Sequence, residues 1–420
     1  MTTRPWPVLV ISCALCVTPA AEAEVLSLGR CVALALERSP ASKAGAENVR
    51  AAQAAYDAAR SHYRPFLFGE LTHDQLFYRP YDFAQRSGLL HLDWSAGDRL
   101  LDAAAAPRQE ILVQQAESRW VDSDLTRQVA HLYISALQRE SRLELLRHRQ
   151  QVLEGHLLVS QAMWRAGTRT QFDVFQTRAA ASRLEEQVLE LKAEADSLQW
   201  ELARLTGIED SQAIELRPLG PQAANLDSLP AAAVLDAQLT SNPLLRTLEL
   251  ESEAERLRRR EIRASRLPHL ALNGGYVADG DPTAAGNYWL AGVSLQAPLV
   301  RWGLTRHEED EIEARARSLR FQADRVHLEL RIQSAQVRGR LVTMQQLGAL
   351  RAERLQNAQQ ALQLADENYR AGLSTNLEYL AAQGEMLDAE EGLQEARAEY
   401  FLGLVDLYIL TGQADRVSNL

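Results

Sequence analysis

The chain has 420 residues and a formal net charge of −11 at pH 7. Its composition is skewed toward alanine, leucine, glutamate, arginine and glutamine, which is typical of long helices and coiled coils. Lysine occurs only at Lys43 and Lys192, and no basic patch or basic tail stands out. We therefore do not expect the protein to bind nucleic acid.

The first 23 residues have the pattern of a secretory signal peptide. Arg4 precedes an apolar stretch from Val8 to Val17, and Ala21-Glu22-Ala23 resembles a small-x-small cleavage site. Cleavage there would leave Cys31 as the single cysteine, so we expect no internal disulfide in the mature chain.

The second half of the sequence repeats the landmarks of the first half. Pro243 follows Pro40 by 203 positions, and Gly372 of an Arg-Ala-Gly motif follows Gly167 of the same motif by 205. A duplication of this length indicates two fused copies of one supersecondary design. The predicted divisions are a signal peptide (1–23), a first repeat (24–207), a linker (208–229), a second repeat (230–412) and a C-terminal tail (413–420).

Each repeat contains long helical arms. From Leu184 to Leu205, apolar or small residues follow a 4-3-4-3 spacing, and the same register recurs from Ala389 to Leu410. This spacing predicts a coiled-coil seam rather than the broader apolar stripe of a globular helix. At 1.5 Å per residue, the preceding arms at about 98–164 and 303–369 would each reach roughly 100 Å.

Helix stop and start signals coincide at about 164–175 and 369–380, where we predict the tips of helical hairpins. In each tip an arginine precedes a glycine suited to the left-handed conformation, and a capping box then opens the next helix. The residues in these roles are Arg165, Gly167, Thr170 and Asp173 in the first tip, and Arg370, Gly372, Thr375 and Glu378 in the second.

Aromatic residues and glycine gather in two stretches, at about 65–95 and 268–299, and each stretch reads as a pair of strands. Nothing after residue 23 approaches the run of about 20 apolar residues that a spanning helix needs. A membrane crossing would therefore need a closed β-barrel, and four strands per chain are too few to close one. The alternative is that the strand pairs cap a soluble helical bundle.

These features together resemble the TolC-like outer-membrane efflux proteins. The resemblance rests on the signal peptide, the tandem copies, the Ser-Pro and Asn-Pro helix starts, a proline before each strand pair, the Arg-Ala-Gly-x-x-Thr tips and the Leu-Thr-Gly endings. It covers about residues 25–412.

The resemblance implies a mainly α fold with a small β part. Long coiled-coil hairpins would form a periplasmic α-barrel, and four strands per chain would join a trimeric 12-stranded β-barrel in the outer membrane of a Gram-negative bacterium. The implied partners are outer-membrane lipid, a periplasmic adaptor protein, and an inner-membrane transporter of the RND or ABC type. The implied function is the passive exit duct of a tripartite efflux pump or type I secretion system.

In this family the duct closes near the tips, where acidic residues follow the tip glycine. The resemblance therefore assigns the constriction to Asp173, Glu378, Tyr369, Arg169 and Trp164. We expect Arg169 to pair with an acidic neighbour. The adaptor-docking residues would be Arg165, Gly167, Thr170, Arg370, Gly372 and Thr375.

Several of these residues could instead have a purely structural role, in helix capping or in packing. Asp173 and Glu378 stand at the N3 positions of the capping boxes, and Trp164 and Tyr369 continue the seam spacing, which favours ordinary packing. No catalytic motif is present, and we expect no enzymatic activity, cofactor or metal. We interpret His307-Glu308-Glu309 as a solvated helix face. The competing function is that of a soluble periplasmic coiled-coil scaffold or adaptor.

Overall fold

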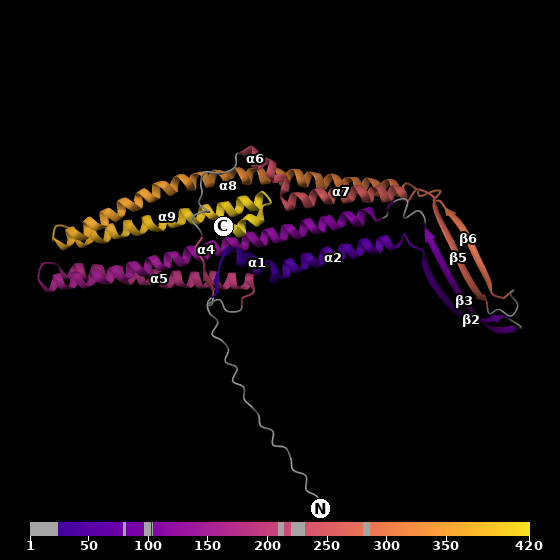
Figure 1. The fold of residues 1–420 in the computed structure, drawn as a ribbon, viewed down its shortest axis with the longest axis horizontal. Helices are drawn as coiled ribbons and strands as arrows, with labels where there is room; N and C mark the ends of the chain where they lie inside the picture. The colour runs from indigo at the N-terminus through magenta and orange to yellow at the C-terminus, as the bar shows by residue number, and fades with distance from the viewer. Residues whose placement is uncertain are drawn as a thin grey trace, which may run out of the picture.

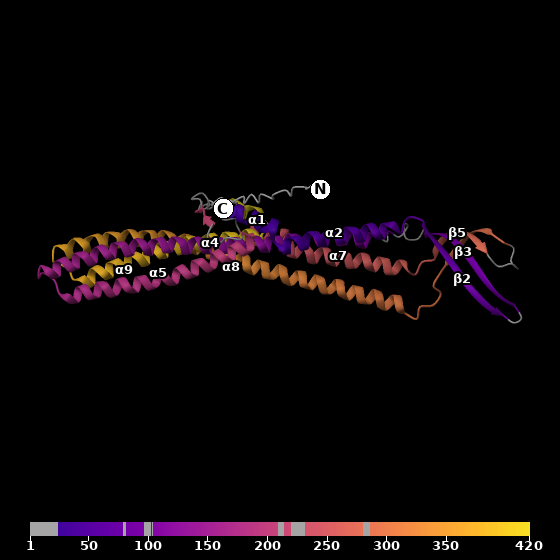
Figure 2. The same cartoon turned by 90° about the horizontal axis from the view of Figure 1, so that it is seen from below.

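The protein is an elongated rod with a β-sheet at one end and the tips of two helical hairpins at the other (Figure 1). The perpendicular view is also narrow, so the length far exceeds both widths (Figure 2). The computed structural model describes residues 24–78, 81–95, 102, 104–208, 214–219, 232–279 and 286–420. The predicted signal peptide (1–23) and most of the predicted linker (208–229) lie outside these residues.

The first half begins with a short strand and two helices, and continues through a strand pair into two long helices. The bounds are β1 (Glu24–Leu26), α1 (Leu28–Arg38), α2 (Pro40–Ser61), β2 (Phe66–Tyr78), β3 (Tyr81–Ser95), α4 (Ala105–Arg165) and α5 (Gln171–Thr206). The side chain of Ser39 caps α2 by accepting the Ala41 N–H, and Pro40 occupies the first turn, where no N–H is needed.

The second half repeats this order from α2 onward. Its elements are β4 (Ile214–Leu216), α6 (Ala232–Gln238), a 3-10 turn (Leu239–Ser241), α7 (Pro243–Ala264), β5 (His269–Asp279), β6 (Tyr288–Gln296), α8 (Leu304–Arg370), α9 (Asn376–Leu410) and a last 3-10 turn (Ala414–Asn419). Asn242 caps α7 as Ser39 caps α2. With 67 residues, α8 is about 100 Å long.

The sheet has the order β2-β3-β5-β6, and each neighbouring pair is antiparallel. Strand β3 of the first repeat pairs with β5 of the second, with Leu90 opposite Tyr276. Strands β2 and β6 therefore form the two edges, and each has one side with no partner in the described part of the chain.

The strands of the first pair are longer than the sequence predicted. The sequence pattern alone predicts strands at about Pro65–Leu71 and Leu89–Trp94, with Tyr78 and Tyr81 in a loop between them. Instead β2 continues to Tyr78 and pairs directly with Tyr81 at the start of β3. The residues between the two predicted strands mix polar and apolar side chains without a regular alternation, and the hydrogen bonds of the antiparallel ladder continue through them.

The seam between long helices is confirmed. In the first hairpin, Leu146 and Leu153 of α4 pack with Leu184 and Leu191 of α5 in one buried cluster. In the second, Leu341 of α8 is fully buried against a cluster from α9, which contains Tyr400, Leu404 and Leu407. Among the described residues, no helix has the length and apolar character required for a membrane span.

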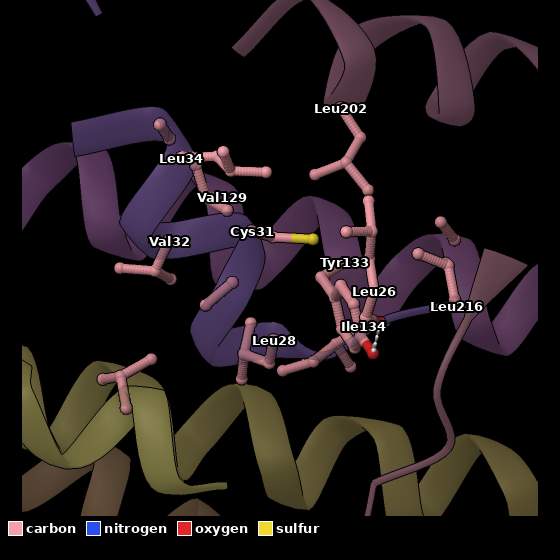
Figure 3. Packing of buried hydrophobic residues seen from close by; sticks show 14 of the residues in the cluster. Leu26, Leu28, Cys31, Val32, Leu34, Val129, Tyr133, Ile134, Leu202 and Leu216 are labelled. Atoms are coloured by element: carbon pink, nitrogen blue, oxygen red, sulfur yellow. Dashed lines mark hydrogen bonds between the residues drawn. The ribbon is translucent and has the colours of Figure 1, made fainter. Parts of the chain in front are cut away.

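The largest core lies in the middle of the rod, where strands β1 and β4 pair in parallel (Figure 3). The Tyr133 hydroxyl lies between the ends of β1 and β4. It is 2.9 Å from the carbonyl oxygen of Leu26, which ends β1, and 2.6 Å from that of Arg217, which follows β4. Burial raises the pKa of Tyr133, so the ring stays neutral at physiological pH. Sequence reasoning missed this strand pair. Cys31 is buried in this core.

Candidate functional site at the helical tips

The tips of two helical hairpins form the end of the rod opposite the sheet (Figure 1). One tip connects α4 to α5, and the other connects α8 to α9. Gly167 and Gly372 adopt the left-handed conformation, with φ of 72° and 77°. No atom lies within 4 Å of a Cβ built on either glycine, so backbone conformation, and not space, requires glycine here. The predicted left-handed glycine turns are confirmed.

Replacing Gly372 with valine is expected to destabilise the second tip by about 1 to 3 kcal/mol, because a β-branched residue is strained at positive φ. The matched control is Gly384→Ala in α9, where the added methyl group meets no atom within 4 Å. The control should stabilise the helix by about 0.5 to 1 kcal/mol. Urea unfolding of both variants checks the prediction, and equal midpoints would contradict it.

Both predicted capping boxes are confirmed. At the first tip, the Thr170 N–H donates to Asp173 Oδ2 over 3.3 Å, and the Asp173 N–H donates to Thr170 Oγ1 over 3.4 Å. At the second, the Thr375 N–H donates to Glu378 Oε2 over 2.9 Å, and the reciprocal bond is 3.3 Å long. Each carboxylate also lies at the positive end of a helix dipole. Asp173 is half-buried and Glu378 is exposed.

Arg169 joins the first hairpin to the second. Its guanidinium group donates to the carbonyl of Tyr369 over 3.0 Å and to that of Ser374 over 2.7 Å. It also lies 4.5 Å from the centre of the Tyr369 ring. Our expectation that Arg169 pairs with an acidic neighbour is wrong. The Tyr369 carbonyl lies in the last turn of α8 and also accepts the Gly372 N–H over 3.1 Å, while Ser374 lies in the turn after the helix. A carbonyl oxygen has two lone pairs, so it can accept from a cation as well.

Tyr369 and Trp164 hold equivalent positions in the two repeats but have different surroundings. Tyr369 is fully buried, and its hydroxyl lies 3.1 Å from Ser160 Oγ of α4. Trp164 is 41% exposed. The two tips therefore differ in packing although their sequence spacing is the same.

A buried polar cluster behind the tips was missed in the sequence. His156 of α4 stacks on Tyr379 of α9 with ring centres 3.8 Å apart, and its Nε2 donates to Asn376 Oδ1 over 2.8 Å. Asn376 in turn donates to the carbonyl of Asp173 over 3.2 Å. The side-chain amide of Asn376 in α9 thus contacts both α4 and α5 and joins the two tips. No periodicity in the sequence indicates this cluster, because its members come from different helices.

The tip is expected to loosen in acid because of His156. Burial lowers its pKa, and the hydrogen bond to Asn376 and the charge of Asp366 oppose that effect while the charge of Arg370 adds to it. A lowered folded-state pKa means that the stabilisation is complete above about pH 6.5 and decreases as the pH falls further. Hydrogen exchange of the tip amides at pH 7.5 and 5.5, expressed as protection factors relative to the intrinsic rate at each pH, should show lower protection in acid. His156→Gln should abolish that change, whereas His148→Gln, an exposed site on the same helix, should not.

The remaining predicted docking residues lie on the outer surface of the tips. Arg370 pairs with Asp366 one turn earlier over 2.9 Å, and Arg165 and Thr375 are exposed. Large apolar side chains are also exposed beside them, namely Phe172, Phe175, Leu373 and Leu377. A water-exposed apolar group of this size is typical of a protein interaction surface. In the part of the chain that the structure describes, no cluster of histidine, cysteine and acidic side chains is arranged to hold a metal.

Comparison with known proteins identifies the class. Residues 234–413, in the second repeat, match the family described as outer membrane efflux protein. The whole rod is similar to the channel protein CusC, with a TM-score of 0.81 and 17% identity over 92% of both chains. It is also similar to the outer membrane protein VceC of Vibrio cholerae, with a TM-score of 0.75 and 18% identity over 92% of this chain and 96% of that one.

The sequence resemblance to TolC-like outer-membrane efflux proteins is confirmed by these matches, and the chain has the fold of that class of channel. A curated relative is the alkaline protease secretion protein AprF of Pseudomonas aeruginosa, 23% identical over 320 residues. The aligned region covers 73% of this chain and 65% of that protein.

Proposed function

We propose that this protein is the outer-membrane exit duct of a tripartite efflux pump or type I secretion system, reaching into the periplasm of a Gram-negative bacterium. The observation that carries the proposal is a four-stranded sheet with two open edges at the end of helical arms about 100 Å long. The family match and the secretion role in the name of AprF support export. Transport needs no catalytic group, so we infer that the protein is not an enzyme.

The open edges of the sheet favour a trimer. Strands β2 and β6 each present unpaired backbone groups, and a bilayer offers no water to satisfy them. Four strands do not close, because known closed sheets begin at about eight. Three copies joined β6 to β2 would supply twelve strands and leave no edge.

The outer face of α8 also fits a neighbouring copy. Phe321, Leu328 and Ile332 lie on one face at near-heptad spacing and are 70%, 56% and 51% exposed. Such a row of apolar side chains is stabilised when another helix covers it. We infer that α2 of the next copy does so, because α2 and α8 flank the two open edges of the sheet.

We further infer that the exposed tip residues dock a periplasmic adaptor, which links the duct to an inner-membrane transporter of the RND or ABC type. Support comes from the exposed apolar groups Phe172 and Leu377, which occupy equivalent positions in the two repeats. An interface would bury them and remove their contact with water.

Glu378 is the residue we propose for the constriction. Its side chain is exposed at the second tip, and capping engages one of its oxygens, so a ring of three copies would keep negative charge at the pore. Glu378→Gln is expected to reduce cation preference in single-channel recordings while the trimer remains intact. Cation selectivity equal to that of the parent would contradict the proposal.

Purified protein reconstituted in planar bilayers tests the function as a whole. The proposal predicts discrete ion-conducting steps from protein recovered in the outer-membrane fraction. A soluble helical monomer that conducts nothing would instead support the alternative, a periplasmic scaffold or adaptor.

A further inference from the structure

Arginine lies in three of the connections between the helices and the sheet. Arg64 lies between α2 and β2, Arg266 between α7 and β5, and Arg301 between β6 and α8. Arg263 adds a fourth guanidinium group in the last turn of α7. These three connections contain no aspartate or glutamate. We call Arg64, Arg263, Arg266 and Arg301 the arginine collar.

The collar has more positive charge than its carboxylate neighbours balance. Arg263 and Arg266 share one carboxylate, Glu309, at 2.9 Å and 2.7 Å. Arg301 donates to the neutral hydroxyl groups of Ser265 and Thr305 over 2.9 Å and 3.3 Å. Among the described residues, no carboxylate pairs with Arg64 or Arg301, so four guanidinium groups face one acid.

His307 is exposed as we interpreted it, but Glu309 is buried, which corrects the interpretation of a solvated face at this residue. It is 8% exposed and also lies 3.8 Å from Arg259. The carboxylate therefore serves to hold arginine side chains in place. At the fourth connection, Asp102 accepts a hydrogen bond from Tyr63 and lies 3.7 Å from Arg108, so it is already paired.

Exposed apolar side chains accompany the collar. Leu299 and Trp302, on either side of Arg301, are each 93% exposed, and Val300 is 67% exposed. Leu267, next to Arg266, is 49% exposed. Arginine interleaved with tryptophan and aliphatic residues is the composition that favours the boundary between headgroups and acyl chains.

The position of the collar agrees with that composition. The four residues lie at the junction where α2, α7 and α8 meet the sheet (Figure 1). If the sheet spans the outer membrane, as the proposed function requires, this junction lies at the periplasmic leaflet.

We propose that the arginine collar binds the phosphate groups of anionic phospholipids in the periplasmic leaflet of the outer membrane. Guanidinium groups bind phosphate oxygens in a bidentate manner and carry less hydration than lysine, which this chain almost lacks. Arg64 and Arg301 contact the lipid phosphate, Trp302 and Leu299 insert at the acyl boundary, and Glu309 positions Arg263 and Arg266. The inference rests on the proposed membrane insertion of the sheet.

Native mass spectrometry of the detergent-solubilised full chain, titrated with phosphatidylglycerol or phosphatidylcholine, tests the proposal. We expect tighter binding of phosphatidylglycerol, weakened about fivefold by Arg64→Gln or by Arg301→Gln. The matched control is Arg340→Gln, an exposed arginine in the middle of α8 that should leave lipid binding unchanged. Oligomer mass in the same spectra confirms that each variant is assembled.

Equal binding of the two lipids, or unchanged affinity in both collar variants, would overturn the inference. So would displacement of phosphatidylglycerol by millimolar inorganic phosphate, because the site would then take a free anion. If the assembled channel conducts but shows no lipid preference, only this inference fails. If the chain neither assembles nor inserts, the proposed function fails with it.

Discussion

Tyr369→Ala is expected to open the duct at its periplasmic end and to raise single-channel conductance. The ring is fully buried among His156, Tyr379 and Arg169, so its removal should destabilise the packing of the tip by about 3 to 5 kcal/mol. The Arg169 guanidinium would lose its aromatic face and keep only its bonds to backbone carbonyls. Planar-bilayer recordings of parent and variant check the prediction.

The control for this variant is Trp164→Ala, which removes the equivalent ring of the first repeat. Because Trp164 is 41% exposed, its loss should change conductance much less. Tyr369→Phe keeps the ring and loses only the contact with Ser160, so it should fall between the parent and Tyr369→Ala. Equal effects of the two alanine variants would show that the tips are equivalent and would contradict the account.

Leu202→Ala is expected to destabilise the middle of the rod by about 2 to 5 kcal/mol. Leu202 is fully buried in the core that contains Tyr133, Val129 and Leu26 (Figure 3). Alanine would leave a cavity between α5 and the strand pair of β1 and β4, where surrounding helices limit collapse. Guanidinium unfolding should show a lower midpoint with an unchanged slope.

Leu189→Ala on the same helix provides the comparison, since Leu189 is 64% exposed. Its removal creates no cavity within the chain and should change stability by less than about 0.5 kcal/mol. A loss as large as that of Leu202→Ala would mean that another copy covers Leu189. A small effect of Leu202→Ala would show that this core does not hold the middle of the rod together.

Local signals in the sequence predicted the tips well. Gly167 and Gly372 must adopt positive φ, and Thr170 and Thr375 must satisfy the first N–H groups of the next helix, so neighbouring residues determine each turn. The coiled-coil seam that begins at Leu184 could also be predicted, because heptad spacing of apolar residues shows which face of the helix is buried.

Contacts between distant segments could not be read in the same way. Strand β1 pairs with β4 across the whole first repeat, and three residues on each side carry no distinctive pattern. The partner of Arg169 was also mistaken, since a sequence does not show that the carbonyls of Tyr369 and Ser374 face it. The two repeats have the same spacing, yet only the second tip buries its aromatic ring.

The extent of the sheet was underestimated for a related reason. Strands β2 and β3 continue to the pair Tyr78 and Tyr81 through residues with no regular apolar alternation, and backbone pairing maintains the ladder there. Alternation of apolar side chains is a weak guide in such strands.

We infer that four strands per chain become a closed sheet only when copies join edge to edge. Native mass spectrometry of the protein extracted from outer membranes in mild detergent measures the number of copies directly. We expect a single species of three chains. A species of one chain that still conducts ions would contradict it.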